Sequence, residues 1–189
     1  MSIRAIIGLG NPGAQYAQTR HNAGAWFIES LSENKHSPLR TDKAFHAVVG
    51  EFSENNVKCF LVKPTTYMNE SGMTVSAIAK FYKLLPHEIL VAHDEMDFAP
   101  GVSRLKQGGG HGGHNGLRDI IACLNSSDFY RLRVGIGHPG HRDLVTDYVL
   151  SAPSRDDRDK IIQSFDNAMA VLPDLLSGKI QQAFHALHS

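Results

Sequence analysis

The feature that most constrains the fold is a short, nearly uninterrupted apolar run from Ile3 to Leu9, which ends in Gly-Asn-Pro-Gly. A run of this length that stops at turn residues is typical of a strand buried on both faces. Such strands occur in sheets that helices cover from both sides. We therefore expect an α/β fold in which this run is a central strand.

Helical and extended patterns alternate along the rest of the chain. Apolar side chains recur at helical spacing over 22–35, 71–83 and 114–124. Asn22 and Ser71 are the expected N-caps of the first two helices, and the chain from about Leu144 onward is expected to be mainly helical.

Strands are expected over five further ranges, 44–52, 57–62, 89–92, 102–105 and 130–136. Ser-Glu-Asn-Asn between the first two of them suits a hairpin. A hairpin among alternating helices and strands indicates a mixed sheet. We predict a single α/β domain over 1–189, with a twisted mixed sheet flanked by helices.

Charge is balanced, since 19 Lys and Arg face 19 Asp and Glu among 189 residues. This balance excludes a protein that binds polyanions through bulk charge. Residues 101–142 nevertheless carry six Lys or Arg against two Asp, a local charge of +4, whereas 84–100 carry a local charge of −4. A nucleic-acid function would have to use such a local surface.

Targeting signals and reactive cysteines are not evident. The start lacks a secretory leader, and no stretch reaches the ~20 apolar residues that span a bilayer, so we expect a cytoplasmic protein without membrane contact. Cys59 and Cys123 both lie among apolar neighbours and are expected to be core residues rather than metal ligands.

Three polar clusters follow predicted strands, around Asn11, around His93 and Asp94, and in the loop 108–116. Ligands of α/β sheets usually bind beyond the carboxyl ends of strands, so these clusters are expected to converge. The glycines in the first cluster match a dinucleotide-binding spacing, but Pro12 and the lack of an immediate helix favour a tight turn.

A histidine and a carboxylate are the candidates for acid–base chemistry. His21 comes just before a helix, where the neutral, basic imidazole is favoured. Asp94 ends a strand, where it could fix the tautomer of that histidine and stabilise its protonated form. No Gly-x-Ser-x-Gly elbow is present. The expected chemistry is direct activation of water.

Three amides, Asn11, Asn69 and Asn115, accompany this pair and suit a substrate rich in peptide groups. Tyr67 and Met68 would form an apolar wall beside Asn69. Asn115 begins a helix after a loop with six glycines in nine residues, whose backbone can approach a ligand closely.

Two other functions stay open on the residues alone. His111 and His114 could bind zinc in a zinc-dependent hydrolase, although no third ligand is near them in the sequence. The segment 93–97 lacks the spacing of a calcium loop. A non-catalytic RNA-binding module would need aromatic stacking positions, for which Tyr16 and Tyr67 are the candidates.

In their order along the chain, the motifs resemble those of bacterial peptidyl-tRNA hydrolase, over about residues 3–150. The matching segments are Gly-Leu-Gly-Asn-Pro-Gly, Thr-Arg-His-Asn-Ala-Gly, Pro-Thr-Thr-Tyr-Met-Asn, His-Asp-Glu, the glycine-rich loop and Arg-Leu-Arg-Val-Gly-Ile-Gly-His-Pro. The resemblance implies an α/β enzyme that cleaves the ester between a peptide and the terminal ribose of tRNA. Such an enzyme recycles tRNA from peptidyl-tRNA that has left the ribosome.

The resemblance also assigns expected roles to residues of this chain. His21 is the general base, Asp94 supports it, and Asn11 is the third catalytic residue. Lys106 and Arg133 correspond to a basic pair for the tRNA 5′-phosphate. The other expected contacts with peptide or tRNA are Tyr16, Tyr67, Met68, Asn69, His114 and Asn115.

Three further expectations follow from the resemblance. The partner is peptidyl-tRNA, bound through its acceptor stem and CCA end. No metal or cofactor is implied, and a monomer is expected. Tyr67 stands where the family usually has Phe, and its extra hydroxyl must be solvated or hydrogen-bonded.

Overall fold

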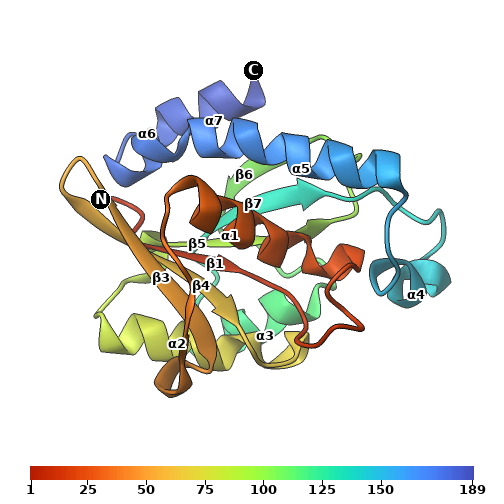
Figure 1. The fold of residues 1–189 in the computed structure, drawn as a ribbon, viewed down its shortest axis with the longest axis horizontal. Coiled ribbons are helices and arrows are strands. Elements are labelled where there is room, and N and C mark those ends of the chain that lie inside the picture. Colours follow the sequence, from red (N-terminus) through yellow and green to blue (C-terminus); the bar gives the residue numbers. More distant parts are fainter.

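The computed structural model describes all 189 residues, which fold around one seven-stranded sheet of order β2-β3-β4-β1-β5-β7-β6 (Figure 1). β1, β4, β5 and β7 run parallel, whereas β3 and β6 run antiparallel to their neighbours. The expected mixed sheet is confirmed. The strands are β1 Ala5–Gly8, β2 Arg40–Asp42, β3 Ala47–Glu54, β4 Val57–Pro64, β5 Ile89–Glu95, β6 Ser103–Gln107 and β7 Tyr130–Gly135.

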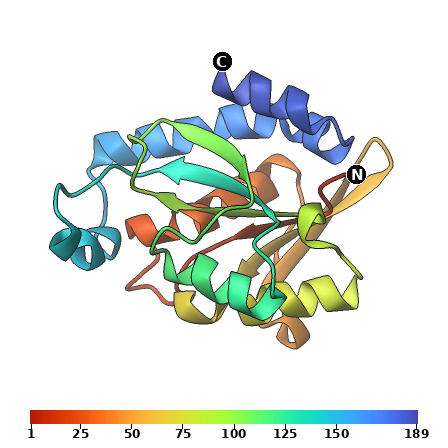
Figure 2. The ribbon, with the colours of Figure 1, turned by 180° about the vertical axis from the view of Figure 1, so that it is seen from behind.

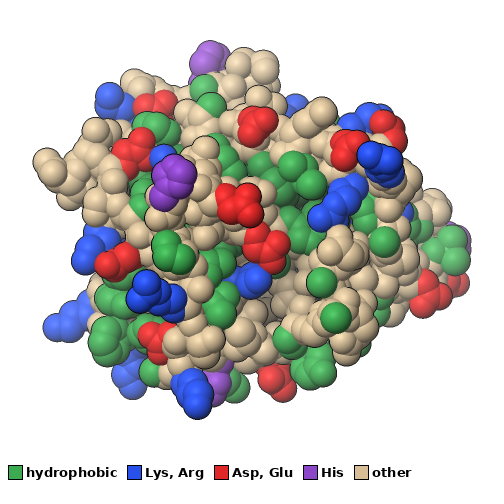
Figure 3. Space-filling model, viewed as in Figure 1, with side chains coloured by type: hydrophobic (Ala, Val, Ile, Leu, Met, Phe, Trp, Pro, Cys, Tyr) green, Lys and Arg blue, Asp and Glu red, His purple; other side chains and the backbone are tan.

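Helices cover both faces of the sheet, as Figures 1 and 2 show from opposite sides. One face carries α1 Ala23–Asn34, α5 Arg155–Ala170, α6 Leu172–Leu176 and α7 Ile180–His188. The other carries α2 Ser71–Phe81 and α3 Asn115–Leu124. The short α4, Val145–Val149, lies at one end of the molecule. None of the helices combines the length and apolar character needed to cross a bilayer. On the face seen in Figure 1, acidic and basic side chains are interspersed rather than gathered by sign (Figure 3).

The hairpin expected in the first third of the chain is formed by β3 and β4. Asn55 and Asn56 connect the strands, with φ of 51° and 65°. Positive φ at both central residues matches a type I′ turn, whose twist suits a two-residue hairpin. β2 was not predicted, because its three residues are polar or charged and give no alternating pattern.

Two glycines bring three backbone segments into contact. A Cβ on Gly8 of β1 would lie 2.3 Å from the carbonyl oxygen of Gly24 in α1, and a Cβ on Gly24 would lie 2.2 Å from that of Ala92 in β5. Any side chain would therefore push α1 off the sheet. Gly8 serves this packing, and α1 begins well after β1, which agrees with a turn rather than a dinucleotide loop.

Two local expectations are wrong, and a third holds only in part. Asn22 is the N-cap residue of α1 as expected, but its side chain makes no capping bond, because Asn11 engages it. Ser71 is the first helical residue of α2, and its hydroxyl donates to the carbonyl of Met68. Cys123 is exposed, with its Sγ near Asp119 and Gly72 at the rim of the contact between α2 and α3, whereas Cys59 is buried as expected.

Candidate active site

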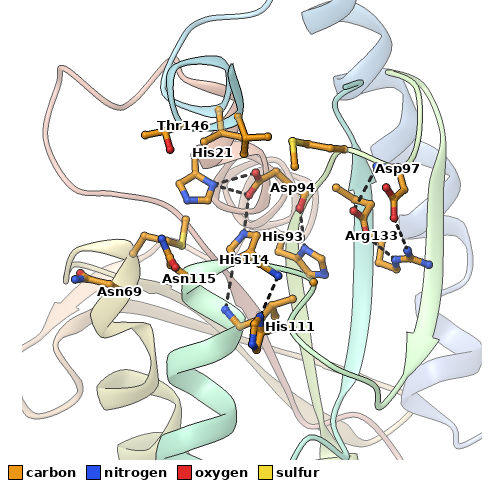
Figure 4. A pocket seen from close by; sticks show the side chains of 18 of the residues that line it. His21, Asn69, His93, Asp94, Asp97, His111, His114, Asn115, Arg133 and Thr146 are labelled. Atoms are coloured by element: carbon orange, nitrogen blue, oxygen red, sulfur yellow. Dashed lines mark hydrogen bonds and ion pairs between the residues drawn. The ribbon is translucent and has the colours of Figure 1, made fainter. Parts of the chain in front are cut away.

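A cleft of about 1170 Å³ opens where β1, β4 and β5 end (Figure 4). Ten of the eleven residues predicted for the site line it. Tyr16 does not, but its ring packs edge-on against Tyr67, with ring centroids 6.4 Å apart. The ten are Asn11, His21, Tyr67, Met68, Asn69, Asp94, Lys106, His114, Asn115 and Arg133.

The glycine-rich loop reaches the cleft by a route that the sequence did not predict. We expected it to follow a strand that ends at the cleft, but β6 is antiparallel, and Gln107 pairs with Tyr130 at the start of β7. The loop 108–113 therefore begins beside the amino-terminal end of β7, at the end of the sheet opposite the cleft. It crosses to the cleft before α3 starts, so the expected convergence occurs for a different reason.

His21 and Asp94 form a buried pair. Nδ1 of His21 lies 2.9 and 3.0 Å from the two carboxylate oxygens. Burial acts to lower the pKa of His21, but the Asp94 carboxylate raises it by more, so the pKa lies above its ordinary value. The expectation that the position before a helix favours the neutral imidazole is therefore wrong, because Asp94 stabilises the protonated form. Because Nδ1 faces the carboxylate, Nε2 is left without a protein partner at the cleft.

His114 holds the same carboxylate from a second side. Its Nε2 lies 2.8 Å from Oδ1 of Asp94, while its Nδ1 accepts the backbone N–H groups of Gly116 and Leu117 at 3.1 and 3.3 Å. An Nδ1 that accepts hydrogen bonds requires the proton on Nε2. His114 therefore donates to Asp94 and caps α3 at the same time.

The two imidazoles keep Asp94 ionised. Burial acts to raise the pKa of Asp94, but His21 and His114 lower it by more, and the pKa lies well below its usual range. Figure 4 shows the carboxylate between the two rings, whose centroids are 4.9 Å apart. A fixed anion is thus built into the floor of the cleft.

His93 lies beneath this group and is neutral. Burial, with His114 next, lowers the pKa of His93 to about 3. Its Nδ1 donates to the backbone carbonyl of Asp94 at 2.8 Å, while its Nε2 is buried without a partner. The ring packs edge-on against His114, with centroids 5.1 Å apart, and so supports the ring that holds Asp94.

The amide of Asn11 is oriented by its neighbours. Its Oδ1 accepts the backbone N–H of Met68 at 2.7 Å, so its NH₂ group has no protein partner at the cleft. Asn22 holds the backbone of Asn11 from both sides, through bonds of 2.9 and 3.0 Å. The sequence does not reveal this role of Asn22, because the two residues meet only in the folded chain.

Asn69 and Asn115 present exposed amides at the same cleft. Asn69 lies in the turn Met68–Glu70 just before α2 and makes no side-chain hydrogen bond. Asn115 opens α3, and its Oδ1 accepts from Arg118 at 3.3 Å. Both side chains can therefore offer an NH₂ group to a ligand.

The two residues expected to bind phosphate differ in how far their charges are already paired. Lys106 is exposed and forms no ion pair, whereas Nε of Arg133 lies 2.8 Å from Glu95. A second nitrogen of Arg133 lies 3.9 Å from Asp97. Both cations project from the same face of β6 and β7, but Glu95 already compensates much of the charge of Arg133.

One group of side chains has the composition of a metal site. Ligand atoms of His21, Asp94 and His114 lie within 4.8 Å of one another. The nitrogens that face Asp94 carry protons, however, and moving the proton of His114 to Nδ1 would aim it at two N–H groups. His111 is outside this group, and its Nδ1 accepts from Gly113 at 2.9 Å. The donors fit a hydrogen-bond network better than zinc.

Fold and site define an α/β enzyme with a mixed sheet, a buried His–Asp pair and three asparagines around one cleft. The sequence profile of a family described as "Peptidyl-tRNA hydrolase" matches residues 5–189. The chain belongs to the peptidyl-tRNA hydrolase family.

Individual relatives agree along the whole chain. A Coxiella burnetii (strain CbuG_Q212) protein named peptidyl-tRNA hydrolase is 54% identical over 187 residues, covering 99% of this chain and 98% of that one. One from Legionella pneumophila (strain Lens) is 51% identical, with both chains covered in full. The crystal structure of peptidyl-tRNA hydrolase from Acinetobacter baumannii matches with a TM-score of 0.94 at 45% identity, covering 98% of this chain and 94% of that one.

Proposed function

We propose that this enzyme hydrolyses the ester that joins a peptide, or an N-blocked amino acid, to the terminal ribose of tRNA. It would thereby recycle tRNA from peptidyl-tRNA that has left the ribosome, in the cytoplasm. The observation that carries the proposal is the orientation of His21, whose Nδ1 faces Asp94 while Nε2 is free at the cleft. The names of the Coxiella and Legionella relatives supply the substrate class.

Water is the nucleophile in this proposal. Nε2 of His21 takes a proton from water as the oxygen attacks the ester carbonyl, which gives a tetrahedral intermediate with a negatively charged oxygen. The bond between the carbonyl carbon and the ribose oxygen then breaks. The ribose oxygen takes the proton from Nε2, so that a free peptide acid and tRNA leave. Asp94 stabilises the transient imidazolium and stays ionised throughout.

Asn11 is the proposed donor to the oxygen that becomes negatively charged. Because its Oδ1 already accepts from Met68, the group it offers to the cleft is NH₂. A preoriented donor of this kind stabilises charge that develops in the transition state. Asn22 holds the backbone of Asn11 in place. The proposed reaction needs no covalent intermediate.

The rest of the cleft would hold the two halves of the substrate. Asn69 and Asn115 bind peptide groups, and Tyr67 and Met68 form the apolar wall beside them, with Tyr16 supporting Tyr67. His114 acts through Asp94.

On the tRNA side, Lys106 is the main ligand of the 5′-phosphate and Arg133 the weaker one. The acceptor stem and CCA end would then cross the cleft. A monomer suffices, because one chain supplies every residue named.

The two alternatives are less well supported. A zinc-dependent hydrolase would need His114 to lose its capping bonds and His111 to join a group from which it is absent. A non-catalytic RNA-binding module does not agree with membership of an enzyme family.

The direct test is release of the amino acid from an N-blocked aminoacyl-tRNA by the His21→Ala variant. We expect kcat to fall roughly 10²–10⁴-fold, the usual contribution of a general base, with little change in tRNA binding or melting temperature. His185→Ala, at an exposed position on α7, is the control and should match the wild type. Near-normal cleavage by His21→Ala would overturn the assignment.

A further inference from the structure

Arg131, on β7, is a buried cation without a carboxylate partner. Only 2% of its surface is exposed, and none of the salt bridges of the molecule includes it. Burial, with the neighbouring charge of Arg133, lowers the pKa of its guanidinium. A buried charge of this kind is costly unless polar groups of the protein replace its water.

The groups that replace the water at its two terminal nitrogens are backbone carbonyls, mainly of the glycine-rich loop, whereas its Nε is buried without a partner. One terminal nitrogen of Arg131 donates to Gly110 at 2.5 Å and the other to Gly109 at 2.6 Å. The second nitrogen also reaches the carbonyl of Ser127 at 3.5 Å, and the guanidinium lies over the ring of Phe129 at 4.7 Å. The planar fork thus spans two successive peptide carbonyls.

Little else fixes this part of the loop. Gly108 donates to the carbonyl of Phe129 where the loop leaves the sheet, and the bonds of His111 stay within the loop or its junction with α3. A Cβ on Gly110, Gly112 or Gly113 would meet nothing within 4 Å. At Gly109, a Cβ would lie 2.9 Å from the side chain of Lys106. Lys106 is exposed and donates no hydrogen bond to the loop, so Arg131 is the main anchor of the loop between its two ends.

The loop leads directly to His114, which holds Asp94, and to Asn115 in the cleft. We propose that Arg131 is a positioning residue: by fixing the carbonyls of Gly109 and Gly110, it sets where His114 and Asn115 stand relative to His21. Its effect on catalysis rests on the proposed function, whereas its effect on the loop does not. Arg131 borders the cleft from beneath the loop, but only 2% of its surface is exposed, and it is not proposed to touch the substrate.

Arg131→Lys tests the geometry of the fork. Lysine carries a compact charge on a flexible chain and cannot span two carbonyls with a planar group. Misplacement of a catalytic element by about 1 Å costs on the order of 10²-fold in rate, so we expect kcat to fall about 10–100-fold with KM within about twofold. Arg104→Lys on β6 is the matched control, because Arg104 bonds only to the adjacent Ser103 carbonyl.

A substrate-free measurement separates this proposal from the proposed function. The N–H groups of Gly116 and Leu117 bond to Nδ1 of His114, so their hydrogen exchange reports the position of that ring. We expect exchange at least about tenfold faster in Arg131→Lys than in the wild type. Arg104→Lys should leave it unchanged. If the wild type lacks ester activity, the proposed function fails while this measurement still tests Arg131.

A second variant, Arg131→Gln, removes the buried charge and keeps a planar donor, so it avoids the desolvation cost of a buried lysine. Thermal melting identifies which variants are folded, and a folded Arg131→Gln should show the same losses. Wild-type kcat and exchange in either folded variant would overturn the proposal. So would a fall in kcat with unchanged exchange, or a change in the salt dependence of tRNA binding as large as that of Lys106→Ala.

Discussion

Oδ1 of Asp94 lies 2.8 Å from Nε2 of His114, so the carboxylate that orients His21 is itself held by a second imidazole. This bond fixes the carboxylate in position, while the buried surroundings keep water from competing for it. The arrangement makes Asp94 a preorganised partner for an imidazolium, which the proposed role of His21 as general base requires.

Asp94→Asn should change the pH profile as well as the rate. Asp94 raises the pKa of His21, and the proposed mechanism needs the neutral imidazole, so wild-type kcat/KM is expected to fall as the pH drops through that raised pKa. The amide removes the effect of the charge, and we expect the acid limb to move to lower pH while kcat falls roughly 10²-fold. Steady-state kinetics across pH, with Asp156→Asn on α5 as the control, check this. An acid limb at the wild-type pH would contradict it.

Glu95→Gln should strengthen tRNA binding. The substitution frees Arg133 from its ion pair at 2.8 Å, so a second cation becomes available to phosphate. Titration of the variant with tRNA at several salt concentrations should give a lower Kd than the wild type and a steeper dependence of Kd on salt. Lys106→Ala should reduce the slope of log K against log salt by about 1. Weaker binding by Glu95→Gln would argue that the ion pair, not free Arg133, forms the phosphate site.

His93→Asn should make the fold less sensitive to acid. The pKa of His93 is lowered from 6.5 to about 3, so between these values the unfolded chain binds a proton that the folded chain does not, and stability falls as the pH falls through this window. Asparagine cannot titrate there, although its amide can still donate to the Asp94 carbonyl.

Urea unfolding at pH 7 and pH 4.5 measures the effect of His93. We expect His93→Asn to be less stable than the wild type at pH 7 but to lose less free energy of unfolding between the two values. The raised pKa of His21 has the opposite effect, because it makes the fold less stable as the pH rises above 6.5. His21 is present in both proteins, so its contribution cancels in the comparison. His185→Asn should behave like the wild type, and equal losses in all three proteins would contradict the assignment.

Chelation should leave hydrolysis unchanged. Nδ1 of His114 accepts two backbone N–H groups, so its Nε2 is protonated toward Asp94 and is not free to bind a metal. Ester cleavage in the presence of EDTA is therefore expected to match cleavage without it. Loss of activity in EDTA that zinc restores would favour the zinc-dependent alternative.

Sequence periodicity predicts well those elements whose own residues show a clear apolar or turn pattern. The run from Ile3 to Leu9 contains β1, which is buried between β4 and β5, and the Asn-Asn turn joins the expected hairpin. The strand at residues 40–42 is not predicted from the sequence, because an edge strand of polar residues has no apolar pattern. The prediction for Cys123 is wrong because its neighbours in the sequence are apolar, while the residue itself lies exposed at the rim of the contact between α2 and α3.

The candidate site could likewise be predicted from the sequence only in part. His21, Asp94 and the three asparagines could be chosen from their chemistry and from the resemblance. The pairing of Arg133 with Glu95 depends on strand order, and the bonds of Asn22 with Asn11 and of Arg131 with Gly109 join segments that meet only after folding. No pattern within either segment specifies such contacts.

The backbone contacts of Gly8 and Gly24 have a consequence for heat inactivation. His21 lies just before α1 and Asp94 near the end of β5, so the segments that carry the pair are clamped together through main-chain atoms. Side-chain motion at the surface cannot separate them. The pair should stay assembled until α1 leaves the sheet, so loss of activity on heating should coincide with cooperative unfolding rather than precede it.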